Sequence, residues 1–446
     1  MKNTIKEEAV ILVSVLKWLI LATIVGVIVG VSTTVFVKTL NWGTELSQNF
    51  KYYYLTLPTG LFLSAIIIKY VFPTAEGHGA NKVIESVHKG TRIKPLMVPV
   101  EFLRTVITVC SGGSAGKEGP SAQIGAGLSS LFADLIGVDG EDRKKLVICG
   151  ISGGFASVFG TPLAGALFGI EVLFAGNMLY SVLLPSFVAG IVSYQVSSWL
   201  GLAYLYHPVT IVPVFSEAFF FKVVLAGVFF GLCSLLLVEI LRLGKKTFAS
   251  LNMSFELKSL LGGVLLAGLT YVFSKQYLGL GIDVIEASLE GKEITSYAFI
   301  LKSIFTSVTL NFGGSGGIGT PIFYVGATAG SIFSKVLSVD PAMLSAIGFV
   351  SLLAGAANTP IAACVMSVEL FGPRIAPYAA IACVISFVVT GHRGAFSSQV
   401  AAIRKSSSID IVLGEEIDKV KPTYAGREKS LTKTLRGIWK FLNSRR

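Results

Sequence analysis

Long apolar segments dominate this sequence and constrain its fold more than any other feature. Each is long enough, or nearly so, to cross the hydrocarbon core of a bilayer, which takes about 20 helical residues. Several are interrupted by glycine, proline, serine or threonine, so we expect some helices to be short, tilted or broken inside the membrane. The segments are Ala9–Val37, Pro58–Phe72, Leu146–Phe174, Leu179–Leu202, Phe219–Leu241 and Leu257–Phe273. Because 52% of the 446 residues are hydrophobic and only 14% are charged, one soluble core could not bury this surface, and the sequence predicts an all-α polytopic membrane protein.

The formal charge of +11 is concentrated at the ends of the apolar segments and in the C-terminal tail, where 11 lysines and arginines stand against 5 acidic residues from Arg404 onward. Basic flanks of this kind are typical of cytoplasmic loops next to anionic lipid. The first apolar segment is too long for the core of a signal peptide, so we interpret it as a membrane helix. We expect a multi-pass protein of the plasma membrane with both termini in the cytoplasm. Its basic surface faces the lipid bilayer and not nucleic acid.

The five cysteines lie in apolar surroundings and show no CxxC or Cys/His metal spacing, and the four histidines form no HExxH motif. We interpret the cysteines as buried structural thiols. The sequence predicts neither a metal site nor a cofactor.

Three sequence blocks of the first half recur in the same order in the second half. The pairs are GHGANKVIESVHKG (Gly77–Gly90) with GLGIDVIEASLEG (Gly279–Gly291), GGSAGKEGP (Gly112–Pro120) with GGSGGIGTP (Gly313–Pro321), and Thr161–Glu171 with Thr359–Glu369. Membrane transporters are often built from such internal repeats. We therefore expect one membrane transport domain over residues 1–404, with repeat halves at about 9–202 and 217–404. A cytoplasmic tail over 405–446, with an amphipathic helix at Leu431–Leu442, would follow it.

The Gly-rich turns of both halves end in proline, which suits the first turn of a helix because no amide hydrogen is needed there. Thr161, Thr320 and Thr359 each precede such a proline and fit the N-cap position, and Gly119 has the same place before Pro120. A helix that begins inside the membrane points its first amides and the positive end of its dipole into the protein. Several such starts would bind a small anion without a full positive charge that holds it too tightly.

Glu118 is an acid in the first of these turns, and the repeat aligns it with Gly319. Among amide donors its carboxylate can occupy an anion position and leave it when protonated or displaced by the permeant ion, so we interpret Glu118 as a gate. The alternative is a glutamate that only pairs with the neighbouring Lys117 at a helix end.

These motifs resemble those of the CLC family of chloride channels and chloride/proton antiporters, in its prokaryotic type without regulatory domains. GSAGKEGP resembles the signature GxxGxEGP, GSGGIGTP resembles the GxFxP region, and GTPLAGALFGIE resembles the segment that follows the gate. The resemblance covers residues from about Leu12 to Arg404. It implies two inverted-topology repeats with broken and tilted helices, and a homodimer with one pore per subunit that carries chloride or a similar small anion and, in the antiporters, protons.

Carried over by resemblance, Glu118 matches the gating glutamate of the family. The anion-coordinating turns match the backbone at Gly116, Lys117, Gly119, Ile318 and Gly319.

This chain also departs from the family pattern. The central serine falls on His78, the late tyrosine on Phe396, the phenylalanine of GxFxP on Gly319, and the internal proton-transfer glutamate on Val172. The imidazole of His78 would either donate to the anion or pack as a neutral side chain. These departures leave the anion selectivity and the internal proton route open.

Glu171 and Glu369 occupy equivalent places in the two repeats. We interpret them as structural residues at helix ends, with a role in transport as the alternative.

The function that this sequence favours is chloride/proton exchange gated by Glu118. A passive channel gated by voltage or pH is the alternative within the same family. GGSAG also satisfies the GxSxG pattern of serine hydrolases, with Ser114 as nucleophile, but the pentad recurs around Ser315, which favours a backbone role. A cation transporter would need several acids or the negative ends of broken helices.

Overall fold

The computed structural model describes residues 2–71, 79–209 and 216–424, so His78 and the segment Leu431–Leu442 lie outside the described residues. The α-helices of the first half are α1 (Lys2–Gln48), α2 (Leu57–Ile66), α3 (Gly79–Lys89), α4 (Met97–Cys110), α5 (Glu118–Leu135), α6 (Gly140–Phe159), α7 (Pro162–Glu171) and α8 (Leu183–Trp199). Those of the second half are α9 (Glu217–Ser250), α10 (Phe255–Val272), α11 (Ile282–Leu289), α12 (Ala298–Asn311), α13 (Gly319–Leu337), α14 (Pro341–Ala356), α15 (Pro360–Phe371) and α16 (Ala376–Val389). The short strands are β1 (Phe174–Ala175), β2 (Val400–Ala401), β3 (Ile409–Asp410) and β4 (Thr423–Tyr424).

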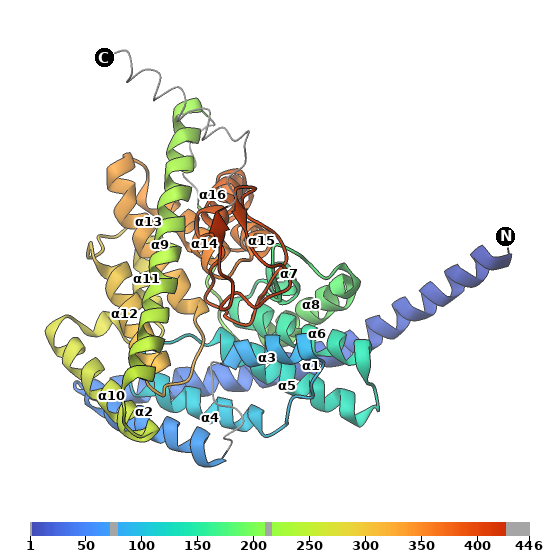
Figure 1. Ribbon diagram of the computed structural model, residues 1–446, viewed down its shortest axis with the longest axis horizontal. Helices are drawn as coiled ribbons and strands as arrows, with labels where there is room; N and C mark the ends of the chain where they lie inside the picture. Colours follow the sequence, from blue (N-terminus) through green and yellow to red (C-terminus); the bar gives the residue numbers. More distant parts are fainter. Residues whose placement is uncertain (1, 72–78, 210–215, 425–446) are drawn as a thin grey trace.

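The two halves contain corresponding helices in the same order. Helix α4 corresponds to α12, α5 to α13, α6 to α14 and α7 to α15, and the two halves lie side by side in Figure 1, blue to teal and lime to orange. The all-α, two-repeat architecture predicted from the sequence is therefore confirmed.

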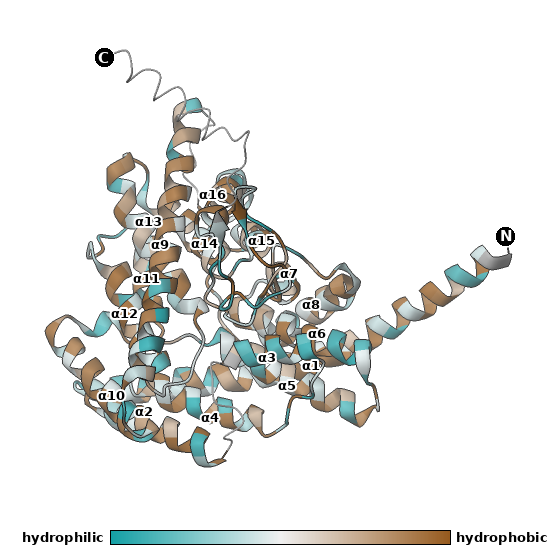
Figure 2. Cartoon of the chain, in the orientation of Figure 1, coloured by the Kyte–Doolittle hydropathy of each residue, from teal (hydrophilic) through white to brown (hydrophobic). Residues whose placement is uncertain are grey.

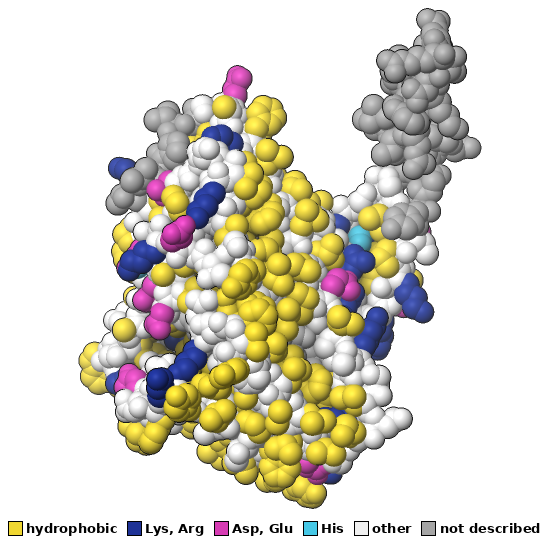
Figure 3. All heavy atoms as spheres, turned by 90° about the vertical axis from the view of Figure 1, so that its left-hand side faces the viewer, with side chains coloured by type: hydrophobic (Ala, Val, Ile, Leu, Met, Phe, Trp, Pro, Cys, Tyr) yellow, Lys and Arg dark blue, Asp and Glu magenta, His cyan; other side chains and the backbone are white. Residues whose placement is uncertain are grey.

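Helices long and apolar enough to cross a membrane number five in the described part of the chain: Thr4–Gln48, Tyr53–Val71, Tyr180–Trp199, Glu217–Ser250 and Phe255–Val272. Apolar residues run along most of their length in Figure 2, and hydrophobic side chains cover much of the face in Figure 3, with charged side chains toward its edges.

Other apolar helices are shorter than a full span, as the interrupted segments predicted. The apolar segment Leu146–Phe174 is divided into α6 and α7 at Gly160, whose φ of 71° is left-handed, just before Pro162 begins the next helix.

Close helix crossings position the start of one helix in each half. In the first half, a Cβ atom at Gly125 of α5 would lie 2.3 Å from the carbonyl oxygen of Gly150 in α6. In the second half, a Cβ at Gly326 of α13 would lie 2.3 Å from the carbonyl oxygen of Gly348 in α14. Because only glycine allows this approach, each helix pair is locked in register, and the starts of α5 and α13 are held rigidly.

Residues 390–424 fold back over the helices and lie between the two halves, in red in Figure 1. Strand β2 pairs in parallel with β1 of the first half, and the Ala395 amide donates to the carbonyl of Ala356 in the second half at 2.7 Å. Ile411 and Ile417 are buried against Ala175 and Ala401. The prediction of a tail that begins at residue 405 differs from this finding, because the isoleucines between the charged residues anchor the chain to the helices as far as 424.

Candidate anion-binding and gating site

The two halves are joined at the glycines that precede α5 and α13. The Gly116 amide donates to the Gly317 carbonyl at 2.7 Å, and the Gly317 amide donates to the Gly116 carbonyl at the same distance. Repeat-equivalent serines and threonines reinforce this bridge. The amides of Ser114 and Ser315 donate to Thr309 Oγ1 and Thr108 Oγ1, both at 3.0 Å. The Ser114 hydroxyl bonds to Thr306 Oγ1 at 3.0 Å, and the Ser315 hydroxyl bonds to Thr105 Oγ1 at 3.2 Å. The duplicated serines thus link the halves, which is the backbone role that the recurring pentad favoured.

This bridge changes the expected role of Gly116. Its amide was expected to contribute to an anion-coordinating turn, but the Gly317 carbonyl already accepts that N–H. The first-turn amides of α5 and α13, at Glu118, Gly119 and Gly319, have no partner within their own helices and remain the backbone donors of this region.

Helices α5 and α13 begin earlier than the sequence predicted. Lys117 and Ile318 occupy the N-cap positions, so Gly119 and Thr320 lie inside the first turn. The reason is that proline is tolerated throughout the first turn, where its missing N–H would have no helical partner. Thr320 is therefore a side chain of the site and not a helix cap.

Helices α7 and α15 begin after Thr161 and Thr359 as expected, but neither threonine side chain caps its helix. Carboxylates from the other repeat do so instead. Glu369 accepts from the amides of Leu163 and Ala164, both at 2.8 Å, and Glu171 accepts from the amides of Ile361 and Ala362 at 3.0 and 2.8 Å. The amides at the starts of α7 and α15 are thus already bound to carboxylates of the protein, which agrees with a structural role for Glu171 and Glu369. The starts of α5 and α13 are left for a transported anion.

The Glu118 side chain is 3% exposed and lies over the glycines of both repeats. A Cβ atom at Gly116 or Gly317 would lie 2.2 or 2.4 Å from Glu118 Oε1, and one at Gly319 would lie 2.6 Å from Glu118 Cγ. Gly319, which the sequence aligns with the family's phenylalanine, therefore leaves free the space that the Glu118 side chain occupies.

One oxygen of this carboxylate has a hydrogen-bond donor and the other does not. Thr320 Oγ1 donates to Glu118 Oε2 at 2.7 Å, while Oε1 is buried without a hydrogen-bond partner among the described residues. Within the same residues, Lys117 and Glu118 are not joined by an ion pair within 4.0 Å, although their charges attract each other, and the hydrogen bond to the carboxylate comes from Thr320.

Two spaces adjoin the hydrogen-bonded pair Glu118 and Thr320. The inner space is a narrow chamber lined by Glu118, Phe155, Phe168, Val172 and Phe396, with almost entirely apolar walls. The outer space is a cavity of about 330 Å³ whose lining includes Thr320 and Lys117. Thr320, the hydrogen-bond partner of Glu118, lines the outer cavity, whereas Glu118 itself lines the chamber.

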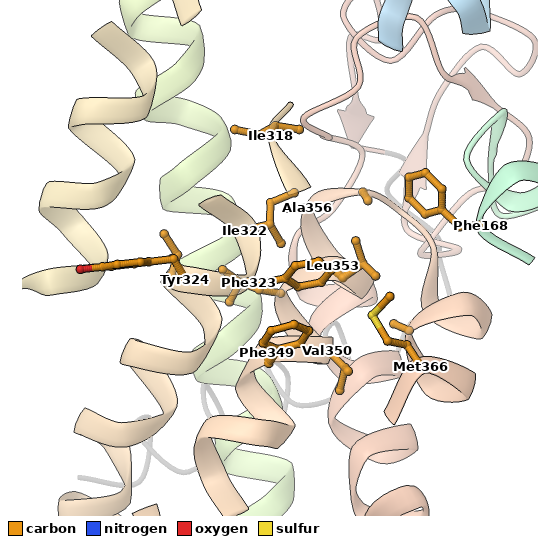
Figure 4. Close-up of a cluster of buried hydrophobic side chains, with 14 of the residues drawn as sticks. Phe168, Ile318, Ile322, Phe323, Tyr324, Phe349, Val350, Leu353, Ala356 and Met366 are labelled. Atoms are coloured by element: carbon orange, nitrogen blue, oxygen red, sulfur yellow. The ribbon is translucent and has the colours of Figure 1, made fainter. Parts of the chain in front are cut away.

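The chamber adjoins a third space, which we call the inner vestibule. The vestibule is lined by Arg242, Lys245 and Asp418 among others, and it shares Ala80, Gly119, Ile318 and Phe396 with the chamber. Figure 4 shows Ile318 at the beginning of α13, above the Phe323 and Phe349 rings, whose centroids are 4.0 Å apart, with Phe168 to one side. An anion in the chamber would meet backbone amides and apolar side chains, among them the Phe396 ring.

A comparison with protein families matches residues 60–391 to the model described as voltage gated chloride channel. The chain belongs to this family, the CLC family. A curated chloride/fluoride channel protein of Pseudomonas syringae pv. tomato is 38% identical to this CLC protein over 403 residues, which is 88% of each chain. A voltage-gated ClC-type chloride channel of Shigella flexneri is 28% identical over 343 residues, covering 74% of this chain and 81% of the relative.

Solved structures agree with the fold. The crystal structure of a CLC-type fluoride/proton antiporter matches with a TM-score of 0.82 and 25% identity, covering 86% of this chain and 97% of the other. A slow cyanobacterial Cl⁻/H⁺ antiporter matches with a TM-score of 0.74 at 18% identity, over 84% of this chain and 94% of the other, and supports the architecture alone.

Sequence reasoning singled out Glu118 and the glycines beside it, but it missed three groups that the structure places in this region. Thr320 was assigned to helix capping, although its place beside Gly319 in the repeat alignment was a usable signal. Gly317 was not singled out, although it is the repeat equivalent of Gly116. The basic pair Arg242 and Lys245 carried no sequence signal, because two cations at the end of a membrane helix look like any cytoplasmic flank.

Proposed function

We propose that this CLC protein exchanges a small halide for protons across the membrane and that Glu118 is its gate. One observation carries the proposal. The buried Glu118 carboxylate lies over Gly319 at the start of α13, as well as at the start of its own helix, and it lines the chamber while its partner Thr320 lines the outer cavity. A carboxylate in that place competes with an anion for the same first-turn amides.

Protonation is what releases the gate in this proposal. The negative carboxylate is held by the Thr320 hydroxyl and by the positive ends of two helix dipoles. A proton taken up by the carboxyl group removes that attraction, so the side chain leaves and an anion enters. Each cycle then moves a proton in one direction and a halide in the other.

Fluoride and chloride are the anions that we propose first. The curated relative at 38% identity is named a chloride/fluoride channel protein, and the solved structure at 25% identity is a fluoride/proton antiporter. The narrow chamber, with the first-turn amides of α5 and α13 as backbone donors beside it, suits a small anion that can approach the main chain closely.

A passive anion channel is the second candidate, and Val172 favours it. This valine is 2% exposed and lines the chamber where the antiporters with an internal proton-transfer glutamate carry an acid. A channel would open when Glu118 leaves, without returning a proton to the other side.

We further propose that the site residues Lys117, Gly119, Ile318, Gly319 and Phe396 shape the anion path, that the protein is a plasma-membrane homodimer, and that the face with residues 390–424 is cytoplasmic. The basic residues Arg242, Lys245, Arg393 and Arg404 on or beside this face support the orientation under the positive-inside rule. Crosslinking in native membranes and labelling of single cysteines from each side test the dimer and the orientation.

Flux under combined gradients tests the function. Purified protein in liposomes is given opposed halide and pH gradients, and the reversal potential is measured for fluoride, chloride and nitrate. Exchange predicts a reversal potential that depends on both gradients, whereas a response to the halide gradient alone identifies a channel. Glu118→Gln is expected to abolish the pH dependence while anion flux persists, and an unchanged pH dependence would show that Glu118 is not the gate.

A further inference from the structure

Two basic side chains of α9 share one carboxylate at the inner vestibule. Lys245 Nζ lies 2.9 Å from Asp418 Oδ2, and Arg242 Nε lies 3.9 Å from Asp418 Oδ1. All three residues line the vestibule that leads to Gly119 and Ile318. Their side chains are 28% exposed for Arg242, 61% for Lys245 and 39% for Asp418, so an ion arriving from solution can reach them.

The position of Asp418 is set by the fold of residues 390–424 and not by the ion pairs alone. The Asp418 amide donates to the carbonyl of Ser397 at 3.3 Å, and the neighbouring Ile417 amide donates to Gln399 at 2.8 Å. Ile417 is 1% exposed in its apolar cluster. Because Ser397 directly follows Phe396, the Asp418 carboxylate is fixed relative to Phe396, which lines both the vestibule and the chamber.

We propose that Arg242 and Lys245 form a docking site for the transported anion at the inner vestibule, and that the Asp418 carboxylate competes with the anion for these two cations. The ligand class is a small monovalent inorganic anion, and the inference rests on the anion transport proposed above. Like Glu118 in the chamber, Asp418 competes with the anion through its carboxylate. Unlike Glu118, it does not take up and release a proton in each cycle.

The surrounding charges support a site that an anion can enter. Glu239 accepts from Arg393 Nε at 2.8 Å and also contacts Arg242 Nη1 at 3.3 Å, so Arg242 is shared between two carboxylates. The Lys245 ammonium contacts Asp418 at the surface, where ion pairs are weak and easily exchanged. An anion can therefore exchange with the carboxylate at these cations, and removal of the Asp418 charge should concentrate anions at the vestibule.

Tracer exchange tests this inference. Liposomes with wild type or Asp418→Asn are loaded with equal halide on both sides, so that the direction of insertion does not matter, and exchange of labelled halide is measured against halide concentration. At low ionic strength, Asp418→Asn should lower the apparent KM about threefold to fivefold with little change in kcat, as expected for one charge a few ångströms away in water. Added salt of an impermeant organic anion should remove the difference.

Matched variants separate charge from structure. Asp410→Asn removes an acid of the same segment that pairs with Arg404 at 2.8 Å and does not line the vestibule, so it should behave as wild type. Asp418→Glu should restore the wild-type KM, and Lys245→Gln should raise it.

If wild type transports the halide while Asp418→Asn has the wild-type KM at low ionic strength, or if Asp410→Asn has the same effect, the docking site is refuted. A wild type that carries no anion would instead refute the proposed function.

Discussion

Replacing Thr320 by valine measures how firmly the gate is held. The Thr320 hydroxyl is the one hydrogen-bond donor to the Glu118 carboxylate among the described residues, at 2.7 Å from Oε2. Valine keeps the branched shape and removes the donor. A hydrogen bond to a charged group contributes about 1.5–3 kcal/mol. The equilibrium constant for the ionised carboxylate to occupy its position should therefore fall roughly 10- to 150-fold. Because anion and carboxylate compete for that position, the apparent KM for the halide should fall by up to this factor.

Tracer halide exchange at fixed pH is the assay, with Thr320→Ser as the control that keeps the hydroxyl. We expect a KM at least threefold lower for the valine variant, and a KM near wild type for the serine variant. An unchanged KM in Thr320→Val would refute the view that this hydroxyl restrains the gate. A raised KM would show that the hydroxyl binds the anion itself.

Three further changes test other parts of the structure. Gly319→Ala would bring a Cβ within 2.6 Å of Glu118 Cγ, so proton-coupled exchange should be lost in the folded protein, whereas Gly268→Ala, which meets open space, should transport normally. Glu369→Gln weakens the two charge-assisted bonds to the start of α7 and should lower the free energy of unfolding by about 1–3 kcal/mol, as read by thermal unfolding in detergent. Burial lowers the pKa of His392, whose Nε2 accepts a hydrogen bond from the Lys405 amide. The stabilising effect of the neutral imidazole is therefore present above the ordinary pKa of about 6.5 and is lost as the pH falls below that value. His392→Asn should flatten the change in melting temperature between about pH 7 and pH 5, and a change as steep as in wild type would contradict this.

The fold was predictable from the sequence because its signals are local. Apolar length gives the membrane helices, and Gly160 followed by Pro162 gives the break between α6 and α7. The repeat added long-range information, since it aligned Gly319 of the second half with Glu118 of the first.

The partners of the site were not predictable in the same way. The bond between Thr320 and Glu118 joins residues of different halves, and no local pattern sets their distance. The same holds for Asp418, which reaches the vestibule because buried isoleucines fold its segment back, a packing effect that polar composition hides. Helix starts were wrong by two residues at α5 and at α13, because proline marks a first turn without fixing its first residue.

The paired hydrogen bonds between Gly116 and Gly317 have a consequence for how such a protein can move. They join the main chains of the two halves, and both bonds would have to break for the halves to part at this point. Where the halves stay joined, we expect access to either side to change through rotation of individual side chains, foremost that of Glu118. The barrier to each turnover should therefore depend on local rearrangement within a stationary scaffold, and spectroscopic distances between the halves should stay constant throughout the cycle.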